Sequence, residues 1–153
     1  MKTLIIGLGN PLRCDDGVGN RVAQLLEKEI DNPEVTVTET NADGLGLLDL
    51  MSGYERVIIV DAIQTQKGKA GQVYRLSLPD LSPPHYFSGT HSIDLVTALE
   101  LGAKLGLAVP REVIIFAVEV ADVSTFSEEC TPEVEGAIPE VIDLVLGELS
   151  GVD

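Results

Sequence analysis

The sequence is poor in aromatic residues and in cysteine. Its 153 residues include no tryptophan, and aromatic side chains make up only 4% of the chain. The two cysteines, Cys14 and Cys130, are too few for a disulfide framework, and they lack the Cys-x-x-Cys spacing of redox or zinc pairs. We therefore expect two reduced thiols and a core that folds without covalent cross-links.

Basic residues are also scarce. The chain has 10 lysines and arginines against 25 aspartates and glutamates, which gives a formal net charge of -15. This negative field repels nucleic acid and anionic membrane surfaces, so a polynucleotide substrate is disfavoured. The same charge favours cations and basic segments of partner proteins.

No apolar run is long enough to cross a bilayer, and no signal peptide precedes Lys2. We therefore expect a cytoplasmic protein with no membrane partner. The chain is 44% hydrophobic with a mean hydropathy of +0.21, which is typical of a globular domain of this length. No linker, repeat or low-complexity tract divides it, so we predict a single domain that spans residues 1–153.

Predicted strands and helices alternate along the chain. Residues 57–60 and 113–118 are continuously apolar, as in strands covered on both faces, whereas 34–39 alternates with period two and is typical of a sheet edge. Residues 71–76 predict an antiparallel edge strand. These patterns predict an α/β fold. We expect a single three-layer domain. Its twisted sheet of about five strands is mostly parallel but mixed, and helices flank it on both faces.

Apolar residues at helical spacing predict four helices. Their buried stripes include Leu25 in the first helix, Leu45 in a short second helix and Leu105 at the end of the third. The last helix starts at Thr131-Pro132, with threonine as the N-cap and proline at the first helical position.

The most specific stretch joins the strand at 3–6 to the first helix and reads Gly7-Leu8-Gly9-Asn10-Pro11-Leu12-Arg13-Cys14-Asp15-Asp16-Gly17-Val18-Gly19. Asp15 and Asp16 fall at the helix N-terminus, where a carboxylate caps the helix and interacts favourably with its dipole. Helix capping explains the presence of one aspartate at this position, but it explains the second aspartate less well. We therefore expect one of them to face a cleft as a metal ligand or acid–base group, and spacing alone does not say which.

Other polar residues are expected at the same edge of the sheet. Asp61 directly follows a buried strand, at the carboxyl end where doubly wound sheets bind ligands, and Glu119 ends another strand in the same way. His91 starts the third helix on its inward face, where the helix dipole keeps the imidazole neutral. Together Asp16, Asp61 and His91 form a mixed nitrogen and oxygen set suited to nickel or zinc.

Two other kinds of site fit parts of this pattern. A dinucleotide site also begins with a strand, Gly-x-Gly and a helix, but Leu12 stands where the third glycine belongs, and two aspartates would face the pyrophosphate. Alternatively, Cys14 near a helix N-terminus could act as a nucleophile with His91 as its base. The adjacent aspartates would raise the pKa of that thiol and disfavour this role.

At these residues the sequence resembles the hydrogenase maturation endopeptidases, which trim the C-terminal extension from the large subunit of nickel-iron hydrogenases. Residues 7–19 match the family pattern Gly-x-Gly-Asn-x-Leu-x-x-Asp-[Asp/Glu]-x-x-Gly. Val60-Asp61-Ala62 is similar to the second acidic position of the family, and Ser88-Gly89-Thr90-His91 is similar to its histidine segment. The start of the last helix, Thr131-Pro132-Glu133-Val134-Glu135, continues the resemblance.

The resemblance implies a hydrolase, an endopeptidase of the aspartic type, whose protein partner is the large-subunit precursor. It implies that Asp16, Asp61 and His91 are the catalytic and metal-binding residues, and that they contact nickel already loaded into the precursor. Nickel is then carried by the substrate, although other divalent cations can bind the same residues in isolation. Cleavage would depend on completed metal insertion.

Two further functions stay open at this point. A nickel-dependent binding protein or chaperone would use the same three ligands without proteolysis. The start Gly7-Leu8-Gly9-Asn10-Pro11 also resembles the peptidyl-tRNA hydrolases, but their nucleic-acid substrate conflicts with the charge of -15, and no histidine occurs before His85. The turn Asn41-Ala42-Asp43-Gly44 departs from a Gly-Thr segment that is frequent in the maturation endopeptidases, which concerns contacts with the substrate tail.

Overall fold

The computed structural model describes residues 2–42, 44–65, 67–81 and 92–151 of the chain. Within these ranges no helix has the length and apolar character needed to span a membrane. In chain order the elements are β1 (Thr3–Leu8), the 3-10 turn η1 (Cys14–Gly17), α1 (Val18–Glu29), β2 (Val35–Thr40), α2 (Gly44–Met51), β3 (Arg56–Ile63), β4 (Val73–Ser77), the 3-10 turn η2 (Leu78–Leu81), α3 (Ser92–Lys104), β5 (Glu112–Glu119) and α4 (Pro132–Ser150).

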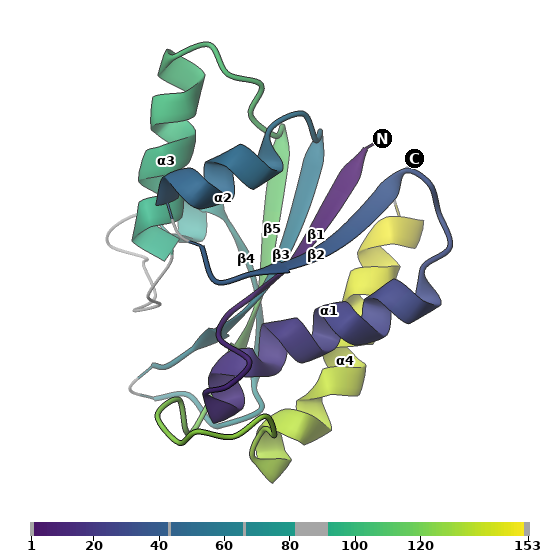
Figure 1. Ribbon diagram of the computed structural model, residues 1–153, viewed down its shortest axis with the longest axis vertical. Helices are drawn as coiled ribbons and strands as arrows, with labels where there is room; N and C mark the ends of the chain where they lie inside the picture. Colours follow the sequence, from purple (N-terminus) through teal and green to yellow (C-terminus); the bar gives the residue numbers. More distant parts are fainter. Residues whose placement is uncertain (1, 43, 66, 82–91, 152–153) are drawn as a thin grey trace.

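The five strands of the described ranges form one sheet in the order β2-β1-β3-β5-β4 (Figure 1). β1 is parallel to β2 and β3, β3 is parallel to β5, and β4 is antiparallel to β5. This mixed sheet, with its antiparallel edge strand, confirms the prediction from the sequence. The continuously apolar β3 and β5 occupy inner positions, and the alternating β2 forms the opposite edge.

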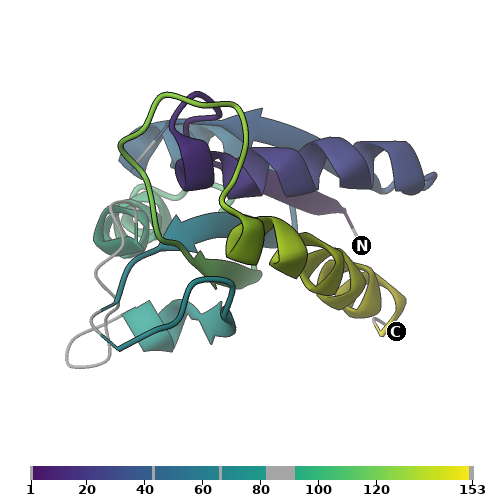
Figure 2. The same cartoon turned by 90° about the horizontal axis from the view of Figure 1, so that it is seen from below.

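Helices cover both faces of the sheet and give the three layers that the sequence predicts (Figures 1 and 2). α1 and α4 enclose one apolar core, which includes Ile5, Phe116 and Val141. α2 and α3 enclose a second core, which includes Ile6 and Leu99. Ile5 and Ile6 enter different cores because successive residues of a strand point to opposite faces.

The start of α1 lies directly against the backbone of the sheet. A Cβ on Gly19 would lie 2.2 Å from the carbonyl oxygen of Val60, and a Cβ on Gly7 would lie 2.3 Å from the carbonyl oxygen of Gly19. Backbone atoms of two packed elements cannot move aside as a flexible side chain can. Glycine at both positions therefore allows α1 to begin in contact with β1 and β3.

Three leucines that helical spacing assigns to buried stripes are exposed, so these predictions are wrong: Leu25 in α1, Leu45 in α2, and Leu105. In α1, Ala23 is buried and lies on the opposite side of the apolar stripe from Leu25. The helix is therefore rotated so that Leu25 faces solvent. Leu45 lies in the first turn of a short helix, and α3 ends before Leu105. The margins of an apolar stripe depend on how each helix is rotated against the sheet, which the spacing does not fix.

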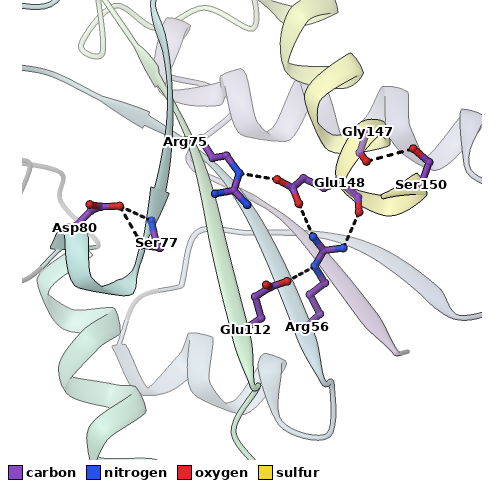
Figure 3. Close-up of polar contacts among 8 residues, drawn as sticks. All are labelled: Arg56, Arg75, Ser77, Asp80, Glu112, Gly147, Glu148 and Ser150. Atoms are coloured by element: carbon purple, nitrogen blue, oxygen red, sulfur yellow. Dashed lines mark hydrogen bonds and ion pairs between the residues drawn. The ribbon is translucent and has the colours of Figure 1, made fainter. Parts of the chain in front are cut away.

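An ion cluster joins α4 to the end of the sheet where β3 and β5 begin (Figure 3). Arg56 is buried, with its guanidinium 2.6 Å from the Glu112 carboxylate and 2.5 Å from that of Glu148. Arg56 also donates a hydrogen bond to the backbone carbonyl of Glu148 at 2.9 Å. Arg75 on β4 lies 2.6 Å from the other Glu148 carboxylate oxygen, but its side chain is 53% exposed.

We predict that Arg56→Ala lowers the free energy of unfolding by about 2 kcal/mol, because it removes charge-assisted hydrogen bonds from a buried group. Arg75→Ala is the matched control, since it removes an exposed partner of the same glutamate and costs at most about 1 kcal/mol. Urea unfolding of both variants measures the difference. If both variants lost the same free energy of unfolding, the burial of Arg56 would add nothing to the stabilising effect of the cluster.

Candidate active site at the carboxyl edge of the sheet

The carboxyl ends of three parallel strands bring the candidate residues to one edge of the sheet. Gly7 of β1 pairs with Val60 of β3, so Asp61 lies one residue beyond that pair. On the other side of β3, Asp61 pairs with Ala117, and Ile63 pairs with Glu119. The loop after β1 leads through η1, which contains Asp15 and Asp16. Asp16, Asp61 and Glu119 therefore lie at the edge where parallel sheets bind ligands, as predicted.

Asp15 is fully buried, and its carboxylate is saturated with hydrogen bonds. One oxygen accepts the backbone N–H groups of Ala121 and Asp122, both at 3.0 Å. The other accepts the backbone N–H of Thr131 at 2.6 Å, and the Thr131 hydroxyl donates to both oxygens. Asp15 thus fixes the segment 121–131, which connects β5 to α4, against η1. It is a structural carboxylate.

Asp16, the next residue, is only half-buried. One of its oxygens accepts the backbone N–H of Asn10 at 2.9 Å, and no described residue hydrogen-bonds the other. Of the two adjacent aspartates, Asp16 is therefore the one with an oxygen available to a metal or to a reacting group. The hydrogen bonds thus distinguish the two aspartates, which the spacing does not.

Neither aspartate caps α1, so the capping prediction is wrong. The N-cap of α1 is Gly17, and no side chain bonds the free N–H groups there. Both aspartates precede it in the short turn η1. Thr131 is the N-cap residue of α4, as predicted, but its hydroxyl oxygen accepts no capping hydrogen bond. The hydroxyl donates to the buried carboxylate of Asp15, which fixes the orientation of the side chain.

Asp61 is the most perturbed carboxyl group of the site. Burial at the end of β3 raises the pKa of Asp61 to about 8, against the lowering effect of the Ala62 N–H, which donates to its carboxylate at 2.8 Å. The negative charge of Asp16, which lies at the same edge of the sheet, raises this pKa further. Two carboxylates at one place are suited to a divalent cation or to acid–base chemistry.

Glu119, at the end of β5, is buried and faces the connection between β3 and β4. It accepts hydrogen bonds from the backbone N–H and the hydroxyl of Thr65, both at 2.7 Å, and from the hydroxyl of Tyr74 at 3.0 Å. Glu119 therefore holds the segment that follows Asp61. Its partners Thr65 and Tyr74 gave no signal in the sequence.

Cys14 does not have the properties of a nucleophile. Its thiol is buried, and burial together with the neighbouring charge of Asp15 raises the pKa of Cys14. Burial also raises the pKa of the second thiol, Cys130, to about 11. Both cysteines are free, as expected. The cysteine-enzyme alternative is therefore contradicted by the structure, because a reactive thiol needs a lowered pKa.

His91 and His85 lie outside the described residues, so the histidine position of the predicted site stays a prediction. In the ranges that are described, no group of three histidine, cysteine, aspartate or glutamate side chains is arranged to hold a metal ion. The structure thus brings Asp16 and Asp61 together, and the third member of the predicted set is not placed.

A family profile described as hydrogenase maturation protease matches residues 20–148. The chain belongs to the hydrogenase maturation protease family. The match covers most of the chain, including the strand β3 that contains Asp61, and starts just after η1. A member of this family is a hydrolase of the endopeptidase class, which supports the main prediction from the sequence over the peptidyl-tRNA hydrolase alternative.

Several known proteins are similar along their whole length. The hydrogenase 2 maturation protease of Escherichia coli strain K12 is 28% identical, and the alignment covers 100% of this chain and 94% of that protein. The solved structure of the hydrogenase maturating endopeptidase HybD from E. coli has a TM-score of 0.83 with 28% identity and covers 100% and 96% of the two chains. The [NiFe] hydrogenase maturation protease HybD from Thermococcus kodakarensis, at 24% identity over 96% and 98%, has the same fold with a TM-score of 0.76.

We predict that Asp15→Ala lowers the free energy of unfolding by about 3 kcal/mol, because it leaves three backbone N–H groups without their acceptor. Asp16→Asn is the matched control and changes stability by less than about 1 kcal/mol, since it disturbs one hydrogen bond of a half-buried group. Urea unfolding measures both. Amide hydrogen exchange should be faster at Ala121, Asp122 and Thr131 in Asp15→Ala only; equal protection in the two variants would contradict the anchoring role.

The raised pKa of Asp61 predicts a pH-dependent stability in the metal-free protein. The folded state holds this proton up to about pH 8, whereas an unfolded aspartate releases it near its ordinary pKa of 3.8. The stabilising contribution is therefore complete below that value and is lost as the pH rises to about 8. Between pH 5 and 9, wild type should lose more stability than Asp61→Asn by over about 1.4 kcal/mol, the equivalent of one pKa unit. Parallel urea-unfolding curves would refute the shift.

Proposed function

We propose that this protein is an endopeptidase that removes the C-terminal extension of a nickel-loaded [NiFe]-hydrogenase large-subunit precursor. The observation that carries the proposal is the placement of two carboxylates, Asp16 with its open oxygen and Asp61, at the same carboxyl edge of the sheet. Family membership supports the class of reaction. The names of the similar proteins, which mature hydrogenase 2 and [NiFe] hydrogenase, support the class of substrate.

The nickel belongs to the substrate in this proposal. Two neighbouring carboxylates repel one another, and a divalent cation bound between them removes that repulsion. The Asp16 oxygen that also accepts the Asn10 N–H and the carboxylate of Asp61 supply oxygen ligands, and His91 supplies the nitrogen ligand that the family resemblance implies. A nickel ion presented by the precursor is recognised by these ligands, so that only a metal-loaded precursor is held in position for cleavage.

Hydrolysis of the peptide bond adds a water oxygen to the carbonyl carbon and a proton to the departing amine. A carboxylate can take the proton from the attacking water and return it to the amine nitrogen. We assign this general-base role to Asp16, because one of its oxygens is held by the Asn10 N–H while the other receives no hydrogen bond from the described residues. In this proposal the endopeptidase is therefore of the aspartic type.

The test is the intact mass of a nickel-loaded large-subunit precursor from the same host before and after incubation with this protein. Wild type should release one discrete C-terminal peptide, and a nickel-free precursor should stay uncut. Asp16→Asn, Asp61→Asn and His91→Ala should each slow cleavage by at least about 100-fold. Asp31→Asn, an exposed carboxylate outside the site, is the matched control and should cleave at the wild-type rate.

The outcomes separate the proposed functions. Cleavage of the nickel-free precursor at the same rate would refute recognition of the metal. An unchanged mass together with a nickel-dependent complex would refute proteolysis and favour a metal-dependent binding protein. Normal cleavage by Asp16→Asn would remove Asp16 from its general-base role.

A further inference from the structure

Two exposed apolar side chains lie on the loops that surround the candidate active site. Phe126, in the 121–131 segment, is 80% exposed, which is the largest value for a big apolar side chain in the described residues. Leu12, in the loop between β1 and η1, is 53% exposed. Leaving a phenylalanine ring in water forgoes the free energy that its burial would contribute. Nothing in the packing of the fold requires the ring to be there.

The two loops form one paired unit. The Ser127 N–H donates to the carbonyl of Leu12 at 3.0 Å, and the Cys14 N–H donates to the carbonyl of Ser127 at 2.9 Å, which makes a parallel bridge between Arg13 and Ser127. The Arg13 guanidinium also lies over the ring of Phe126, 5.9 Å from its centre. Figure 2 shows the two loops side by side along one edge of the molecule. Leu12 and Phe126 are therefore presented together.

Buried Asp15 holds this unit in place from behind. Its carboxylate binds backbone N–H groups at both ends of the 121–131 segment, at Ala121, Asp122 and Thr131. The Asp15 N–H also donates to the carbonyl of Asp122 at 2.9 Å. An exposed aromatic side chain on a loop that is fixed at both ends has little conformational entropy left to lose on binding, which is the property of a preorganised binding surface.

We infer that Leu12 and Phe126 form a docking surface for the protein substrate, at the segment that flanks the peptide bond to be cleaved. The inference rests on the proposed function. The reason is that the surface is continuous with the candidate site. Leu12 and Asp16 are four residues apart in the connection from β1 to α1. A polypeptide whose nickel is held at Asp16 therefore passes over Leu12 and Phe126. A protease that recognises a folded precursor needs such contacts beside its reacting groups.

The charge around this surface defines the chemistry of the segment that it takes. Glu128 and Glu129 are exposed and follow Phe126 by two and three residues, whereas the Arg13 guanidinium lies over the ring. The substrate segment therefore carries an apolar side chain that contacts Phe126 and at least one lysine or arginine that faces the two glutamates. The net charge of -15 attracts such a segment at long range.

The experiment measures kcat and KM for the nickel-loaded precursor, together with the dissociation constant of the complex by biolayer interferometry. The Leu12→Ser/Phe126→Ser double variant should raise KM and the dissociation constant at least about 10-fold and leave kcat within about twofold, because it loses binding and not chemistry. Leu105→Ser, which changes a leucine that is 66% exposed beyond α3, is the control and should match wild type. Added salt should raise the wild-type KM, since it screens the contact with Glu128 and Glu129.

Each outcome decides a separate question. An unchanged KM and dissociation constant in the double variant, with active wild type, would overturn the docking surface and leave the protease intact. Wild type that binds the precursor without cutting it would overturn proteolysis, and the double variant would still test docking through its affinity. Wild type that neither binds nor cuts would overturn both. Self-association of wild type that the double variant loses would instead assign this surface to a second copy of the chain.

Discussion

The arrangement of the site depends on one backbone contact, between the first turn of α1 and the ends of β1 and β3. Gly19 lies against the carbonyl oxygen of Val60, and Gly7 lies against the carbonyl oxygen of Gly19. Both contacts are too close to leave room for a Cβ atom. This contact allows the loop before α1 to fold over the end of β3. Asp16, in that loop, then lies close enough to Asp61 for its charge to raise the Asp61 pKa. Larger residues at either glycine would push the helix, and with it Asp16, away from the sheet.

Adjacent aspartates in this loop have different roles because their surroundings differ. Asp15 is buried, and both of its carboxylate oxygens accept hydrogen bonds from the 121–131 segment, so neither oxygen is open to a ligand. Asp16 is half-buried with one open oxygen. The structural carboxylate thus fixes two loops together, and those loops place both the half-buried carboxylate of Asp16 and the exposed ring of Phe126. The stability of the loops and the two proposed roles therefore depend on the same buried group.

Much of the fold was predictable, because strands and helices of an α/β domain leave strong local patterns. The continuous apolar runs of β3 and β5 indicated inner strands, and the alternation of β2 indicated an edge. Asp61 was also predictable, since a carboxylate after a buried parallel strand lies at the ligand edge. The exposure of the Leu25 and Leu45 side chains was not predictable, because helical spacing gives the width of an apolar stripe but not the rotation of the helix against the sheet.

The sequence by itself determined the alternation of elements, the edge at which polar residues gather, and the family that the motif at 7–19 resembles. These properties are carried by residues near one another in the chain. Only the tertiary structure decided which aspartate is structural, that Cys14 has a raised pKa, and that Phe126 is paired with Leu12. Each of these depends on the approach of the 121–131 segment to η1, more than 100 residues earlier, and contacts over such separations leave no periodic pattern in the sequence.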